Sequence, residues 1–317
     1  MKNVSIADQH VPVDKKTIAR KWFGEGCRYD RLEPDSDRAI ASYRKSIRCD
    51  DTFGDAYVNL GFIYLKRERY DDALKYFGKV VQLKPNNPET YNDLGYVYER
   101  MGRIGSAKQM YYQALEIDPG NTEAMLNIAH VLELEGNYHG AIQQYRKTIE
   151  TDPHGAAAHF CLAVLYDRHD MFDEAIQEYR NALTKNPDYL KALFNLGNLH
   201  VQLGDYPEAI VYFERALHLE PDNAEAWNTL GSLYEETQLY NKALAAFEQS
   251  IVLNPLSEEA HLNLASLQCR AYYAKPERRK KEEIVRRLDF ILSVNPHNRS
   301  GQQLLEELTG TQLREVR

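Results

Sequence analysis

The sequence contains no closely spaced pair of cysteines. Its four cysteines, Cys27, Cys49, Cys161 and Cys269, lie far apart, so we expect neither a zinc ribbon nor a disulfide framework. No apolar run approaches the roughly 18 residues of a membrane helix, and residues 1–16 contain no apolar leader segment. These absences predict a cytoplasmic protein with reduced thiols and no membrane insertion.

Positive charge is also in deficit. The 317 residues include 39 Lys and Arg against 47 Asp and Glu, which gives a net charge of −8. This is the wrong sign for a protein that binds phosphate backbones, so nucleic acid is not expected as a partner. One basic run, at residues 275–287, is interleaved with Glu277, Glu282 and Glu283, and we interpret it as the solvated start of a helix.

Catalytic motifs are missing as well. The sequence has no GxxxxGK[ST] nucleotide loop, no GxSxG elbow and no HExxH. Of its ten histidines, His130 is expected on a groove surface, and His200 in a packing position with no carboxylate at helical spacing. Because no nucleophile or second ligand accompanies either residue, we expect no enzyme, no cofactor and no bound metal.

The sequence does contain an internal repeat, with a period of about 34 residues. Four series recur at this interval: small residues from Gly61 to Ala265, alanines from Ala73 to Ala243, prolines from Pro85 to Pro255 and aromatic rings from Phe77 to Phe247. Within each unit, apolar residues fall at helical spacing in two segments of about 13 residues, which predicts a helix hairpin. N-caps are expected at Asn87, Asn121, Asn223 and Ser257, and left-handed turns between the helices at Gly102, Gly136 and Gly204.

These units resemble the tetratricopeptide repeat. One unit carries the pattern Trp227, Leu230, Gly231, Tyr234, Ala243, Phe247 and Pro255, and another carries Tyr57, Leu60, Gly61, Tyr64, Ala73, Phe77 and Pro85. The resemblance implies an all-α fold of about 17 helices: a right-handed superhelix of about eight repeats with a C-terminal capping helix. The first helix of each repeat would line a concave groove.

The same resemblance sets the expected domain boundaries. The repeats are expected at about 19–53, 54–87, 88–121, 122–155, 156–189, 190–223, 224–257 and 258–298. A flexible tail would occupy residues 1–18, and the capping helix with a tail would occupy residues 299–317. The N-terminal tail, with His10, Lys15 and Lys16, is expected to be a plain flexible end, and occupation of the groove is the alternative.

Asparagines recur on the expected groove. The set comprises Asn59, Asn127, Asn195 and Asn263, which occupy the same place in every second repeat, together with Asn92, Asn198 and Asn228. An amide offers both a donor and an acceptor, so it can bond the backbone of an extended chain whatever side chains that chain carries. The set resembles the asparagine ladder of the tetratricopeptide superhelix in O-linked N-acetylglucosamine transferase. The alternative is that these are solvated helix residues, although asparagine is a poor helix former.

Charged residues expected on the groove are mostly acidic. The acids are Asp55, Glu89, Asp93, Glu99, Glu123, Glu133, Asp167, Glu225, Glu235, Glu236 and Glu259, and the bases are Lys66, Arg100, Arg168, Lys191 and Arg270. A polar or basic guest is therefore favoured. The sequence predicts a monomeric, non-catalytic scaffold or adaptor that binds an extended segment of a partner protein. A scaffold that self-assembles through its repeat ends or convex face is the alternative.

Overall fold

The structure, a computed structural model, describes residues 14–310. It divides after Pro153 into two compact units, and each is described by itself. The parts of the expected tails in residues 1–13 and 311–317 lie outside the described range. Across residues 14–310, every helix falls short of the combined length and apolarity that a membrane span requires.

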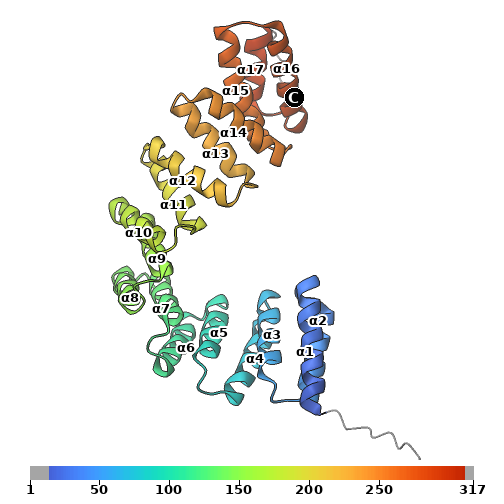
Figure 1. Cartoon of the computed structure of the whole chain (residues 1–317), viewed down its shortest axis with the longest axis vertical. Helices are drawn as coiled ribbons and strands as arrows, with labels where there is room; N and C mark the ends of the chain where they lie inside the picture. The colour runs from blue at the N-terminus through green and yellow to red at the C-terminus, as the bar shows by residue number, and fades with distance from the viewer. Residues whose placement is uncertain (1–13, 311–317) are drawn as a thin grey trace, which may run out of the picture. The chain divides into compact units, whose positions relative to one another are not determined.

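Unit 1 consists of four helix hairpins (Figure 1). Its helices are α1 (Lys15–Leu32), α2 (Asp37–Cys49), α3 (Gly54–Lys66), α4 (Tyr70–Leu83), α5 (Pro88–Arg100), α6 (Ile104–Ile117), α7 (Thr122–Leu134) and α8 (Tyr138–Thr151). Each odd-numbered helix packs on the helix that follows it, and successive hairpins pack side by side.

Unit 2 repeats this plan and ends with one additional helix. Its helices are α9 (Ala156–Arg168), α10 (Phe172–Lys185), α11 (Leu190–Gln202), α12 (Tyr206–Leu219), α13 (Ala224–Glu236), α14 (Tyr240–Leu253), α15 (Glu258–Ala274), α16 (Arg278–Val294) and α17 (Arg299–Thr309). Helix α17 packs on α15 and α16, as a capping helix does. The prediction of 17 helices without strands is confirmed for residues 14–310.

Two local signals explain where the helices begin and end. The Asn121 side chain accepts a hydrogen bond from the Ala124 amide at the start of α7, and Asn223 does the same for Ala226 at the start of α13. In the turn after α5, Gly102 has a φ of 72°, the left-handed conformation that glycine adopts without strain. The caps and turns predicted from these residue types are confirmed.

Small residues allow the two helices of a hairpin to approach closely. A Cβ added to Gly95 of α5 would lie 2.4 Å from the Tyr111 ring of α6, and one added to Gly231 of α13 would lie 2.6 Å from Phe247 of α14. Both rings are fully buried. The recurring series of small and aromatic residues is therefore a series of packing contacts.

One boundary differs from the expected ones. Helix α1 begins at Lys15, four residues before the expected start of the first repeat at residue 19. In the last hairpin, α15 and α16 each have 17 residues, which absorbs the extra residues that the sequence shows there.

Candidate binding site

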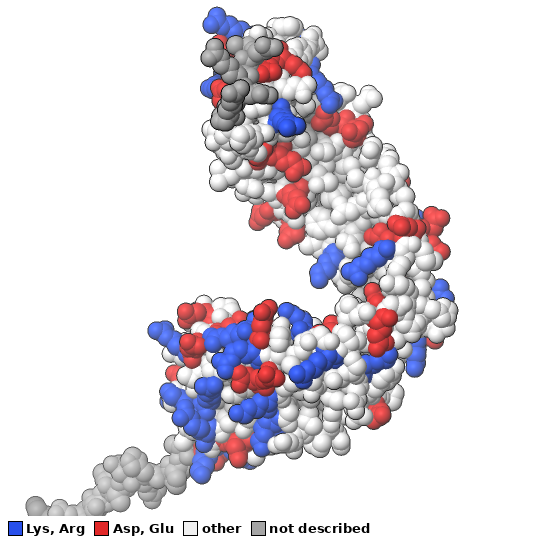
Figure 2. Space-filling model, turned by 180° about the vertical axis from the view of Figure 1, so that it is seen from behind, with Lys and Arg blue, Asp and Glu red and all other residues white. Residues whose placement is uncertain are grey.

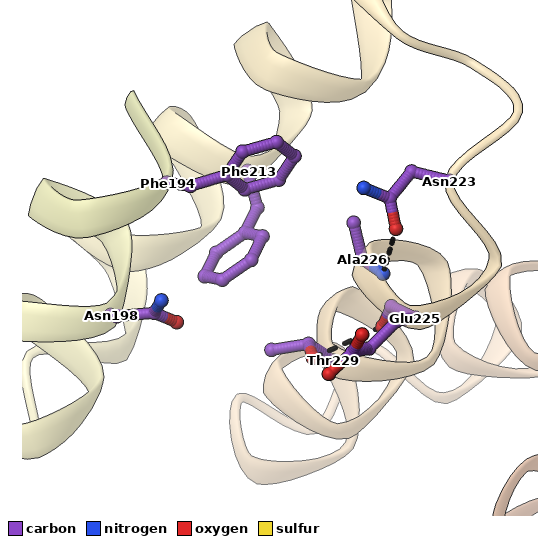
Figure 3. Close-up of a pocket in the computed structure, with 7 residues that line it drawn as sticks. All are labelled: Phe194, Asn198, Phe213, Asn223, Glu225, Ala226 and Thr229. Atoms are coloured by element: carbon purple, nitrogen blue, oxygen red, sulfur yellow. Dashed lines mark hydrogen bonds between the residues drawn. The ribbon is translucent and has the colours of Figure 1, made fainter. Parts of the chain in front are cut away.

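The surface of unit 2 has a hollow between the first helices α11 and α13. A cavity of about 220 Å³ lies there. Figure 3 shows two phenylalanine rings and Asn198 on one side of it, with the first turn of α13 on the other. This volume is below the roughly 300 to 1,000 Å³ of small-molecule pockets, and it suits one side chain of a longer ligand.

The walls of the cavity differ in chemistry. Phe194 and Phe213 meet edge to face, with their ring centres 5.9 Å apart, and they form an apolar wall. Opposite them lie Glu225 and Thr229 of α13. The Glu225 carboxylate has no ion-pair partner among residues 14–310, so the cavity combines apolar surface with an available negative charge.

The asparagines of unit 2 fall into two groups. Asn198 is exposed and lines the cavity. Asn195, one turn earlier, is half-buried, and its amide nitrogen donates to the Tyr179 hydroxyl at 3.2 Å. This bond leaves the Asn195 carbonyl oxygen available. These two amides are accessible to a ligand.

The other two asparagines of unit 2 are engaged with each other. The Asn228 side chain is only 7% exposed, and its amide donates to Glu259 at 3.0 Å. Its carbonyl oxygen accepts from the Asn263 amide at 3.1 Å. Asn228 therefore has both hydrogen-bonding groups occupied within the fold, whereas Asn263 keeps its carbonyl oxygen.

In unit 1 the structure separates the three predicted asparagines. Asn92 is 3% exposed and donates to Asn121 at 3.1 Å, so it joins α5 to the start of α7. The amide of Asn59 lies 3.9 Å from the sulfur of Cys27. Asn127 is half-buried and has no hydrogen bond from its side chain within the described residues. Only Asn59 and Asn127 remain partly accessible to a ligand.

One of these contacts gives a structural reason for an asparagine that follows a buried tyrosine. Three of the four asparagines in alternate repeats follow a buried tyrosine at one fixed interval: Asn59 follows Tyr43, Asn127 follows Tyr111 and Asn195 follows Tyr179. Where the second helix carries Phe77 or Phe213 instead, the corresponding residues are Asp93 and Thr229. The contact between Asn195 and Tyr179 accounts for Asn195, because a buried hydroxyl needs a polar partner, whereas the buried Tyr145 is followed at the same interval by Cys161. The fourth, Asn263, follows Phe247 and bonds Asn228 instead.

The same tyrosines use acids of the first helices. The Tyr179 hydroxyl donates to Asp167 at 3.2 Å, and the Tyr111 hydroxyl donates to Glu99 at 3.0 Å. Burial raises the pKa of Tyr179 above its ordinary value of 10, so the hydroxyl stays protonated and remains a donor. Several acids that the sequence assigned to the groove are thus bonded within the fold.

One acid of unit 1 has an altered charge state. Burial, together with the neighbouring carboxylates Glu123 and Glu89, raises the pKa of Asp93 to about 7. Near neutral pH, Asp93 is therefore only partly ionised. In the same unit, the imidazole of His130 lies 3.5 Å from the Glu99 carboxylate.

His200 has a carboxylate neighbour that does not come from helical spacing. Its Nδ1 lies 3.1 Å from the Asp205 carboxylate. Asp205 follows five residues later, at the N-cap of α12, so the turn between the helices brings it back to the ring. His200 itself is 4% exposed and stacks on Tyr212, as its assignment to a packing position predicted.

Within residues 14–310, no three His, Cys, Asp or Glu side chains form a metal ligand set.

Sequence reasoning missed the aromatic part of the cavity. Phe194 and Phe213 belong to periodic positions that are mostly packing positions, so their residue types gave no signal. Thr229 could have been found, because it stands one repeat after Asn195 and one repeat before Asn263.

Comparisons with known proteins address the family and the fold. Family models described as tetratricopeptide repeat match residues 52–120, 92–156, 129–189, 168–233 and 200–267. No curated protein sequence matches the chain closely enough to count as a relative.

Among solved structures, the C-terminal part of a TPR repeat-containing protein from Cytophaga hutchinsonii is similar. It has a TM-score of 0.62 and 17% identity over 77% of this chain and 98% of that chain, which shows the fold. YrrB, a TPR protein with an unusual peptide-binding site, has a TM-score of 0.45 and 20% identity over 58% of this chain and 95% of that chain. The APC/C hetero-tetramer Cut9-Hcn1 has a TM-score of 0.47 and 20% identity over 89% of this chain and 55% of that chain. The resemblance to the asparagine ladder of the glycosyltransferase stays a hypothesis.

Proposed function

Because the chain belongs to the tetratricopeptide repeat family, we propose that it is a non-catalytic scaffold or adaptor that binds an extended segment of a partner protein. Repeats of this family bind proteins and peptides. The observation that carries the proposal here is the cavity between α11 and α13, where an apolar wall, an accessible amide and an unpaired carboxylate meet. The site uses the first helices, the same surface that the sequence resemblance assigns to binding.

In this proposal, the amides of Asn195 and Asn198 hold the backbone of the segment. Asn198 offers both its donor and its acceptor, and Asn195 offers its carbonyl oxygen, since its amide nitrogen is engaged by Tyr179. Asn59, Asn127 and Asn263 are further candidates for backbone contacts. Asn92 and Asn228 support neighbouring helices instead, because their side chains are buried and bonded within the fold.

The cavity itself would take one side chain of the segment. An aliphatic stem would lie against Phe194, and a terminal cation would reach the Glu225 carboxylate. Lysine and arginine have this combination of apolar stem and charged head. We therefore expect the bound segment to be polar or basic, with one basic residue in the cavity.

The test is a selection of binding peptides from a displayed random library, followed by affinity measurements on the selected peptide. Replacing Asn195 and Asn198 together by alanine should weaken binding by roughly tenfold or more, because each lost hydrogen bond costs about 0.5–1.5 kcal/mol. Glu225→Gln should lower the affinity for basic peptides and leave the affinity for neutral peptides unchanged. Unchanged affinity in a folded double variant would place the ligand on another surface.

Asn181→Ala is the matched control, since Asn181 belongs to the second helix α10 and lies outside the cavity.

Light scattering at micromolar concentration addresses the alternative function. A monomer is expected, and concentration-dependent growth of the particle mass would favour the self-assembling scaffold.

A further inference from the structure

The first two helices concentrate positive charge that the proposed groove does not use. Together, α1 and α2 contain ten Lys and Arg and only three Asp and Glu, whereas the whole chain has a net charge of −8. Figure 2 shows Lys and Arg side chains gathered over the N-terminal helices. This surface therefore differs in sign from the rest of the protein.

Six of these cations form one cluster, here called the basic end: Lys15, Lys16, Arg20, Lys21, Lys45 and Arg48. The start of α1 and the end of α2 lie together there, because the Ser46 hydroxyl donates to the Ala19 carbonyl at 2.8 Å. The Lys45 ammonium lies 3.9 Å from the centre of the Trp22 ring. All six side chains are exposed, and none forms an ion pair within residues 14–310.

Helix stability does not account for the cations at the start of α1. Its first turn contains no acid, and Asp14 at the N-cap makes no capping hydrogen bond. The positive end of the helix dipole disfavours Lys15 and Lys16 at this place. Several other first turns carry acids instead, for example Glu89 in α5 and Glu123 in α7. The basic end is therefore arranged against the preference of its own helix.

We propose that the basic end binds a short acidic segment of a partner protein, distinct from the segment held in the groove. Lys15 to Lys21 extend over about 10 Å of helix, at 1.5 Å per residue. An extended chain covers this length with about three or four residues, at about 3.3 Å each. The complementary partner is a run of three or four aspartates or glutamates.

The borders of the basic end favour a short ligand over an extended polyanion. Glu25 follows one turn after Lys21, and Asp50 and Asp51 follow Arg48. A nucleic acid duplex carries a charge about every 1.7 Å along its axis and would continue into these acids. A membrane surface would meet the same acids, and the Trp22 ring that could insert into it is covered by Lys45.

The test uses fluorescence anisotropy with a labelled peptide of consecutive glutamates, measured on the full chain at low and at high salt. Wild type should bind this peptide, and binding should weaken as salt rises. The triple variant Lys16→Gln, Lys21→Gln and Lys45→Gln should lose at least roughly tenfold in affinity. Its circular dichroism spectrum should be unchanged, because the three side chains are exposed.

The start of α16 supplies the matched control. Its cations Arg278 and Lys280 are ion-paired with Glu282 and Glu277 at 3.1 and 2.9 Å. The triple variant Arg278→Gln, Lys280→Gln and Lys281→Gln should therefore bind the glutamate peptide as wild type does. Equal losses in the two triple variants, or no binding by wild type, would overturn the proposal. A second result would also overturn it. This is the case if a DNA duplex or anionic vesicles bind more tightly than the peptide and the triple variant Lys16→Gln, Lys21→Gln and Lys45→Gln abolishes that binding.

Discussion

The two units present different chemistry on the same helical plan. At the ninth residue of the repeat, unit 1 carries Phe62, Tyr96 and His130, and the two rings are 40% and 41% exposed. At the same place in α11, α13 and α15, unit 2 carries Asn198, Ser232 and Ser266. Unit 1 thus offers aromatic and imidazole groups at this place, and the last three repeats of unit 2 offer small polar ones, whereas α9 of unit 2 carries Val164.

The packing positions do not follow this division. Gly95 meets Tyr111 in unit 1, and Gly231 meets Phe247 in unit 2, with nearly the same geometry. The contrast teaches that the fold constrains the residues between the helices, whereas the first-helix surface is free to vary. Binding preference is therefore expected to differ between the units although their backbones are alike.

The largest effect is expected at the shared packing contacts. Gly95→Ala and Gly231→Ala should each lower the free energy of unfolding by about 2 kcal/mol, because the added methyl group meets an aromatic ring that cannot move away. Urea denaturation measures the change. Gly78→Ala is the control: its Cβ would meet nothing within 4 Å, so a gain of up to about 1 kcal/mol is expected. A loss confined to one unit would break the claim that both share one packing rule.

The next effect concerns the buried acid of unit 1. Folded Asp93 holds its proton up to a pH of about 7, whereas the unfolded chain releases it near the ordinary pKa of 3.8. The folded state binds more protons between these values, so the contribution of Asp93 to stability falls as the pH rises through this window.

Consequently, the stability advantage of Asp93→Asn over wild type should be about 2–3 kcal/mol larger at pH 8 than at pH 5, and it should shrink further as the pH falls towards 3.8. Thermal unfolding at the two pH values checks this. The substitution places at residue 93 the amide that repeats in unit 1 already carry at Asn59 and Asn127. Glu150→Gln on the exposed surface should show no such pH dependence, and a pH-independent gain in Asp93→Asn would contradict the assigned cause.

A smaller effect tests the pairing of tyrosine with asparagine. Tyr179→Phe should cost about 1 kcal/mol, because Asn195 and Asp167 both lose their partner hydroxyl. A double-mutant cycle with Asn195→Ala should show a coupling of about 0.5–1.5 kcal/mol. Phe213→Tyr is the converse control, since Val201 and Thr229 stand where the acid and the amide would be needed. If the losses in the free energy of unfolding of the two single variants simply add up in the double variant, the contact between tyrosine and asparagine does not explain the spacing of the asparagines.

The smallest effect on stability is expected at the ninth residue of the repeat. Tyr96→Asn and Asn198→Tyr exchange the residue types of the two units at exposed sites, so the free energy of unfolding should change by less than about 0.5 kcal/mol. Ligand preference should change instead, as measured by repeating the peptide selection on each variant. A large loss of stability would show that this surface also carries packing energy.

Much of the fold could be predicted because its signals are local and periodic. The Asn121 and Asn223 caps act within three residues of their own position, and glycine at 102 marks a turn by its backbone alone. The candidate site was less predictable. Asn195 and Asn228 are both groove asparagines by spacing, yet one keeps a free acceptor and the other is buried between Glu259 and Asn263.

The sequence by itself determined the repeat, the hairpins and the family, since a fixed repeat period imposes the same helix contacts wherever it occurs. Only the tertiary structure decided which polar side chains remain available. His200 meets Asp205 because a turn reverses the chain, and the Asn195 amide meets the Tyr179 hydroxyl because two hairpins stack. The availability of a hydrogen-bonding group depends on neighbours from other helices, and the spacing within one helix does not specify them.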